Sequence, residues 1–154
     1  MADKKNISDL TDHLGYWMRL VSNSVSQEFA RKLNSKDVTV AEWVILRKLF
    51  DSTDTTSSSY IVELTGLTKG AVSKLIERLI QKDFVIKKES KTDRRFHEIS
   101  LTARARKLVP QLAALADQND YEFFSSLNQK EKKKMKEILL KIAQTKNLKK
   151  SPIE

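Results

Sequence analysis

The side chains best suited to chemistry in this chain of 154 residues lie between Thr68 and Arg95, and most of them are basic or carry a hydroxyl. Lysine and arginine bind phosphates and guanine acceptors, and serine and threonine hydroxyls bond to phosphates or to base edges. This segment therefore has the chemistry of polyanion binding. The candidate contacts are Thr68, Lys69, Gly70, Ser73, Lys74, Arg78, Lys91, Asp93, Arg94 and Arg95.

The overall charge also indicates a polyanionic partner. The formal net charge is +9 and the isoelectric point is near 9.7. Twelve basic residues stand against five acidic ones between Thr68 and Lys107. This basic charge leads us to expect double-stranded DNA as the partner. No apolar run reaches membrane-spanning length and the N-terminus has no apolar signal core, so we expect no membrane association and a cytoplasmic location.

Catalysis and metal binding have little support in the sequence. The absence of cysteine excludes a disulfide framework, a thiolate zinc site and a thiol redox switch. The chain has no glycine-rich phosphate loop, and no second metal ligand stands at a useful spacing from His97. We therefore expect no enzymatic activity, no cofactor and no metal.

Two helices are predicted before the basic segment. Apolar residues at a spacing of three to four indicate one long helix over residues 7–33. Thr39, followed three residues later by Glu42, forms a capping box for a second helix that ends near Phe50. Residues 51–59 are polar and predict a loop.

The basic segment itself predicts a helix-turn-helix followed by a β-hairpin. A short helix over residues 58–65 stops at Gly66, and Thr68 caps the next helix. The buried face of this second helix is formed by Val72, Leu75, Ile76 and Leu79. Two strands, 84–88 and 96–101, then flank a charged tip, which makes the unit a winged helix.

In a winged helix the second helix enters the major groove and the hairpin reaches the backbone or the minor groove. Gly70 weakens its helix, and its expected use is a close approach of backbone N–H groups to a phosphate. An arginine at the tip, Arg94 or Arg95, would enter the minor groove, while Asp93 holds the tip in shape. The alternative is a solvated, charged surface without a partner.

The stretch "LTKGAVSKLIERLIQKDFVIKKESKTDRRFHEISLT" resembles the core of a winged-helix regulator of the MarR family. The most specific match is the Asp-Arg-Arg tip at residues 93–95, with "SLT" closing the second strand. The resemblance implies a homodimer on an inverted-repeat operator, a repressor more than an activator, and control by a small aromatic or anionic effector. Asp83 departs from the family's glycine, so we expect another turn conformation there.

The fold class that follows is mainly α with a small β-hairpin, in one domain over residues 1–154. The winged helix-turn-helix occupies 39–101, flanked by dimerisation helices at 7–33 and 103–146. Thr102 caps a long helix to about Phe124, and Asn128 with Glu131 caps the last one. The apolar faces of the first and last helices are wide for one small winged helix and would pair with a second copy. Residues 146–154 are expected to fray.

Four side chains are candidates for an effector pocket, because aromatic groups with a polar handle often line such sites. They are His13, Tyr16, Trp17 and Trp43. Ordinary packing in the core or against a dimer partner explains them as well. For the chain as a whole, the expected function is sequence-specific transcriptional regulation; the alternative is a non-specific DNA-binding or protein-interaction module.

Overall fold

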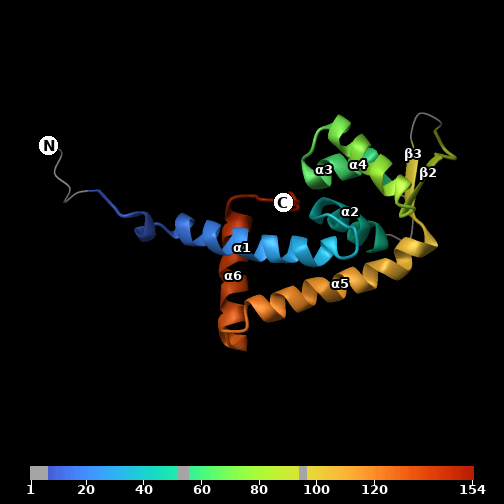
Figure 1. Cartoon of the computed structure of the whole chain (residues 1–154). Coiled ribbons are helices and arrows are strands. Elements are labelled where there is room, and N and C mark those ends of the chain that lie inside the picture. Colours follow the sequence, from blue (N-terminus) through green and yellow to red (C-terminus); the bar gives the residue numbers. More distant parts are fainter. Residues whose placement is uncertain (1–6, 52–55, 94–96) are drawn as a thin grey trace.

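The computed structural model describes residues 7–51, 56–93 and 97–154. Within these residues the fold consists of six α-helices, a short 3₁₀ turn and a three-stranded sheet, so the expected fold class is confirmed. Two long helices, α1 and α5, lie along each other and form the base of the molecule (Figure 1). The compact unit of α2, α3, α4 and the sheet sits on one end of this pair, and α6 runs across the other.

The first helix starts later than expected. A 3₁₀ turn, η2 (Leu10–Asp12), is closed by the side chain of Asp12, which accepts the N–H of Asp9 at 2.9 Å. His13 is extended, with φ −93° and ψ 127°, and it separates this turn from α1 (Leu14–Asn34). The prediction of one helix from residue 7 is therefore wrong for the first two turns.

The second helix, α2 (Val40–Asp51), has the expected capping box. The N–H of Thr39 donates to Glu42 Oε2 at 3.0 Å, and the N–H of Glu42 donates to Thr39 Oγ1 at 3.2 Å. The predicted loop after α2 is wrong at its end, because Thr56–Ser57 forms a strand, β1, that pairs with β3. Ser57 also caps the following helix by accepting the N–H of Tyr60 at 3.3 Å.

The helix-turn-helix is confirmed. The first helix, α3 (Ser58–Thr65), ends at Gly66, whose φ of 70° is the left-handed conformation that favours glycine. The second, α4 (Lys69–Gln81), is capped by Thr68, which accepts the N–H of Ala71 at 3.1 Å. The predicted apolar face of α4 is buried in the core at Val72, Leu75, Ile76 and Leu79.

The turn from α4 into the sheet contradicts one expectation. Asp83 has a φ of 58°, so it adopts the left-handed conformation that a glycine would take. The expected change of turn conformation does not occur. Aspartate tolerates this region better than most residues. The N-terminus of the next long helix fixes the turn, since Thr102 Oγ1 donates to the Asp83 carbonyl and Arg104 Nη1 to the Lys82 carbonyl, both at 2.8 Å.

The wing is an antiparallel pair of strands, β2 (Val85–Glu89) and β3 (His97–Leu101). Val85 lies opposite Leu101 and Glu89 opposite His97, and β1 adds to the other side of β3. Ile99 and Leu101 share the buried face, as predicted, and join the side chains of α2 and α4 in the core. The sheet thus fixes the wing beside α4.

Two helices complete the chain. In α5 (Ala103–Phe123), Asn119 is buried and accepts a hydrogen bond from Lys32 Nζ of α1 at 3.0 Å. Lys32 also pairs with Glu122 at 2.9 Å, so these contacts join α1 to α5. The last helix, α6 (Gln129–Thr145), starts with the predicted capping box of Asn128 and Glu131.

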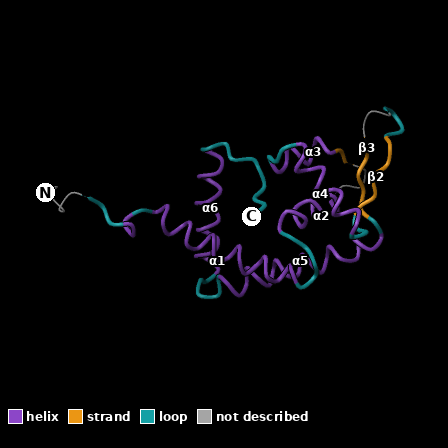
Figure 2. The backbone as a smooth tube through the Cα atoms, turned by 45° about the horizontal axis from the view of Figure 1, so that its top comes forward, coloured by secondary structure: helices purple, strands orange, loops and turns teal. Residues whose placement is uncertain are grey.

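The segment after α6 is ordered against the rest of the chain, so the expectation of fraying is wrong. Asn147 is left-handed, with φ 54°, and the N–H of Leu148 donates to the Ala143 carbonyl at 2.9 Å. This arrangement reverses the chain as a Schellman motif does. The tail then runs to the helix-turn-helix (Figure 2), where the N–H of Ser151 donates to the Leu64 carbonyl at 3.0 Å.

Candidate nucleic-acid interface

The outward face of α4 is exposed opposite its buried stripe. It carries Gly70, Ser73, Lys74 and Glu77, at the three- and four-residue intervals that share one side of a helix, with Lys69 beside them. These are the side chains that a major groove would meet if α4 were the reading helix. The placement that the sequence predicts for Lys69, Gly70, Ser73 and Lys74 is therefore present in the structure, whereas contact with DNA stays a prediction.

Nothing in the described part of the chain requires a glycine at position 70. A Cβ atom built there meets no heavy atom within 4 Å, and the residue has an ordinary helical φ. Alanine would stabilise the helix by about 1 kcal/mol at such a position. The open space in front of Gly70 is compatible with close approach of another backbone. Thr68, by contrast, already uses its hydroxyl oxygen to cap α4.

Arg78 lies between solvent and a buried carboxylate. Its side chain is 55% exposed, and its Nε is 3.7 Å from Oε1 of Glu42, which is fully buried. Lys82 approaches the same group, with Nζ 3.0 Å from Oε2. The sequence indicates Glu42 as a helix cap and gives no sign of these two contacts, because they join residues about forty positions apart.

The near side of the wing tip is built around Ser90. Its Oγ accepts the N–H of Thr92 at 3.3 Å and the N–H of Asp93 at 3.4 Å. Sequence reasoning missed this serine, although a serine hydroxyl often stabilises a turn by accepting the backbone N–H two residues later. Lys91 is exposed beside it and Asp93 is half-buried. Arg94 and Arg95 lie outside the described residues.

The four aromatic or histidine candidates for an effector pocket do not form one cluster within the chain. His13 donates through Nδ1 to the Asp9 carbonyl at 3.0 Å, and Trp17 donates to the Thr11 carbonyl at 2.8 Å. Tyr16 packs edge-on against Trp17. Trp43 instead packs on Phe29, which lies about 18 Å beyond Trp17 along α1 at the helical rise per residue.

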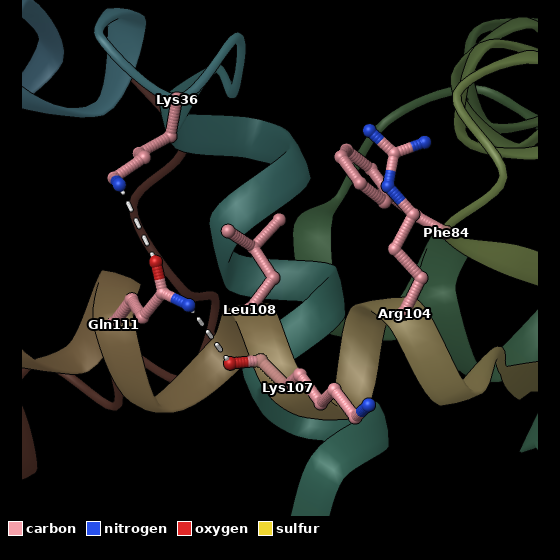
Figure 3. A pocket seen from close by; sticks show the side chains of 6 residues that line it. All are labelled: Lys36, Phe84, Arg104, Lys107, Leu108 and Gln111. Carbon is pink, nitrogen blue, oxygen red and sulfur yellow. Dashed lines mark hydrogen bonds between the residues drawn. The ribbon is translucent and has the colours of Figure 1, made fainter.

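A basic hollow that the sequence did not indicate lies along the first turns of α5, between Lys36 and Phe84 (Figure 3). Its floor is formed by Phe84 and Leu108. The Arg104 guanidinium stands 5.1 Å from the Phe84 ring centroid, and Lys36 Nζ donates to Gln111 Oε1 at 3.3 Å. Lys107 completes the rim.

Electrostatic pairing also perturbs one carboxyl group between α1 and α5. The hydrogen bond from Lys32, followed by that from Gln118, holds the pKa of Glu122 below its ordinary value. Among the residues that the structure describes, no cluster of three or more His, Asp or Glu side chains is placed to hold a metal ion. In the same residues, no helix combines the length and the apolar character needed to cross a bilayer.

The chain is similar in sequence to known transcriptional regulators. A sequence model described as "MarR family" matches residues 36–95, which span α2, the helix-turn-helix and the start of the wing. The curated regulator that it resembles is the "HTH-type transcriptional regulator MgrA" of Staphylococcus aureus, 27% identical over 143 residues, which cover 92% of this chain and 93% of MgrA. Over residues 36–95 the chain is similar to the MarR family. The MarR-family proteins to which it is similar are transcriptional regulators, not enzymes.

Solved structures of MarR-family proteins have the same fold. The S. aureus MepR–DNA complex is 25% identical with a TM-score of 0.76, covering 86% of this chain and 98% of MepR. Bordetella bronchiseptica BpsR, described in connection with regulation of its DNA binding by 6-hydroxynicotinic acid, is 24% identical with a TM-score of 0.78. The match covers 90% of this chain and 98% of BpsR. A mutant of Escherichia coli MarR complexed with operator DNA is 20% identical with a TM-score of 0.76. The match covers 88% of this chain and 99% of the MarR mutant.

Proposed function

We propose that this chain is a cytoplasmic MarR-family repressor that binds an inverted-repeat operator in double-stranded DNA as a homodimer. The observation that carries the proposal is the exposed face of α4, where Lys69, Ser73 and Lys74 surround the open backbone at Gly70, next to a basic wing. The buried stripe on the other side fixes this face outward. In this scheme Thr68, Arg78, Lys91, Asp93, Arg94 and Arg95 complete the DNA contact.

The homodimer is supported by apolar side chains that one chain leaves uncovered. On η2 and α1, Leu10 is 76% and Leu14 is 83% exposed. On α6, Leu139 is 43% and Leu140 is 49% exposed. A soluble surface seldom leaves two apolar faces open, and a symmetric partner would cover both. The proposed organisation is one domain, with 7–33 and 103–146 as dimerisation helices and 39–101 as the winged helix-turn-helix.

An inverted repeat follows from this symmetry. Two α4 helices related by a two-fold axis read the same sequence on opposite strands, at half-sites about one helical turn apart. A dimer spanning such a site would exclude RNA polymerase from an overlapping promoter, which is the basis for proposing repression. The relatives that were solved with DNA, MepR and the MarR mutant, are consistent with this mode of binding.

Effector control is the second element of the proposal. A small aromatic or anionic molecule would bind near His13, Tyr16, Trp17 and Trp43 and change the spacing between the two DNA-reading lobes. Within one chain these side chains lie in two places, so a shared pocket would need the dimer partner to bring them together. The effector-linked description of BpsR is compatible with such control.

The alternative function is a non-specific DNA-binding or protein-interaction module. Glu77 leaves room for it, because a carboxylate on the outward face of α4 can accept only from the amino groups of cytosine or adenine and so adds little to base reading. A competitor titration separates the two functions. Specific binding survives a large excess of random DNA, whereas non-specific binding titrates away.

The experiment that tests the proposal is selection of bound fragments from a random DNA pool, followed by sequencing. A palindrome with half-sites about one turn apart would support both the reading helix and the dimer. Recovery of unrelated fragments would favour the alternative. Light scattering of the free protein then reports the dimer independently of DNA.

A further inference from the structure

A buried carboxylate lies directly behind the DNA-facing helix. Glu42, in the first turn of α2, is 0% exposed, and its Oε2 accepts both the N–H of Thr39 and Nζ of Lys82 at 3.0 Å. A neutral glutamine would serve the capping box equally well. Helix capping therefore explains the position of Glu42 but not its negative charge.

The other carboxylate oxygen faces Arg78. Oε1 is buried and accepts no hydrogen bond from the described residues, and Nε of Arg78 is 3.7 Å away. A buried carboxylate oxygen is stabilised by a nearby cation, so the Nε edge of Arg78 is favoured on this side. Lys74, one turn earlier, shares with Arg78 a groove along the flank of α4.

We propose that Glu42 is a positioning residue for DNA binding, which orients Arg78 so that its guanidinium meets a backbone phosphate. This inference rests on the proposed DNA-binding function. A guanidinium is planar and has five donors, so one edge can face a carboxylate while another bonds a phosphate. An arginine that is already ordered in the free protein loses less conformational entropy when DNA binds.

The role connects two parts of the fold. Glu42 belongs to α2, whose next residue, Trp43, packs on Phe29 of α1. Arg78 belongs to α4. A displacement of α2 relative to α4 therefore changes the direction in which Arg78 is presented, even if the outward face of α4 itself is unchanged.

The test compares two variants that change the net charge equally. Glu42→Gln keeps the side-chain volume and an acceptor for the Thr39 N–H but removes the charge. Asp51→Asn is the matched control, because Asp51 lies on the same helix and pairs with Arg47 rather than with α4. Fluorescence anisotropy with the selected duplex should show about threefold to tenfold weaker binding for Glu42→Gln than for Asp51→Asn, since one long side chain must then be ordered on binding.

Removing Arg78 distinguishes positioning from a purely structural effect. Arg78→Gln should weaken binding, and between 50 and 200 mM salt its affinity should fall about threefold less than that of the wild type, as one phosphate contact is lost. In the Arg78→Gln background, Glu42→Gln and Asp51→Asn should bind equally, because no guanidinium remains to be oriented. A structural defect would persist in that background.

A second variant leaves Glu42 in place. Arg78→Lys keeps the charge, but lysine lacks the rigid planar fork that presents two donor edges in fixed directions. It should bind more weakly than the wild type with the same salt dependence. Circular dichroism melting establishes that each compared protein is folded at the assay temperature.

Three results would overturn the positioning role: equal affinities of Glu42→Gln and Asp51→Asn with Arg78 present, a Glu42→Gln defect that survives in the Arg78→Gln protein, or unchanged binding by Arg78→Gln. In each case wild-type binding to the duplex would leave the proposed function standing. Failure of the wild type to bind duplex DNA even at low salt would overturn both.

Discussion

Lys82→Met tests how the chain holds α4 against the rest of the fold. Lys82 Nζ donates to the Asp37 carbonyl at 2.7 Å and to Glu42 Oε2 at 3.0 Å. Methionine keeps the apolar stem and the main-chain carbonyl that accepts from Arg104, but removes the cation. The buried Glu42 carboxylate then loses its hydrogen-bonded counter-ion.

The magnitude follows from the geometry of this pair. Removing one partner of a buried ion pair costs about 3–5 kcal/mol. The side chain of Lys82 is 23% exposed and Arg78 remains 3.7 Å from the carboxylate, so both water and a second cation reduce the loss. We therefore expect the lower end, about 3 kcal/mol, and a melting temperature lower by about 6–12 °C for a chain of this size.

Urea denaturation at a fixed protomer concentration measures the effect, since formation of the proposed dimer would couple stability to concentration. The double variant Glu42→Gln, Lys82→Met should recover most of the loss, because no buried charge is left without a partner. A change below about 0.5 kcal/mol for Lys82→Met would refute this reasoning. So would a double variant whose cost equals the sum of the two single ones.

Four further changes have defined outcomes. Asp83→Gly should raise the free energy of unfolding by up to about 1 kcal/mol in urea, because glycine takes a left-handed φ without strain, and Asp83→Ala should lower it. Gly70→Ala should stabilise the protein by about 1 kcal/mol and weaken DNA binding; unchanged affinity would exclude close approach of a phosphate there. Leu139→Glu should convert the dimer to a folded monomer in light scattering, since one chain leaves this side chain 43% exposed. Lys32→Met should raise the pKa of Glu122 in an NMR titration. Because that pKa is lowered in the folded state, the pair contributes stability above the ordinary glutamate pKa of about 4.3 and loses it as the pH falls further. The stability difference between wild type and Lys32→Met should therefore shrink in acid to the part that the hydrogen bond from Lys32 to Asn119 contributes.

The features that the sequence could predict are those that short stretches determine. The capping boxes at Thr39 and Asn128 and the cap at Thr68 each involve residues within three positions, and all three form as expected. The buried stripe of α4 follows equally from helical spacing. These local signals suffice for the helix-turn-helix, because its geometry is fixed by two caps and one glycine.

The missed features depend on contacts between distant residues. β1 is a two-residue strand that exists because β3 offers it a partner, and polar residues such as Thr56 give no alternating pattern at that length. The burial of Glu42 depends on Lys82, forty positions away. Asp83 was mispredicted for a different reason. The glycine that the family has at this position indicates a positive φ, and aspartate can adopt that φ as well, because it tolerates the left-handed region better than most residues.

The hydrogen bond between Ser151 and Leu64 limits how far the helix-turn-helix can move from α6. Residues 146–150 connect Thr145, the last residue of α6, to Ser151, where the tail meets α3. The six residue steps from Thr145 to Ser151 span at most about 22 Å when fully extended. While that bond persists, α3 cannot travel further than this from the end of its own α6, whatever the partner subunit does. Any larger displacement of α3 must first break this main-chain hydrogen bond. In the proposed dimer, the intact bond would therefore limit the half-site spacings that the two subunits can reach.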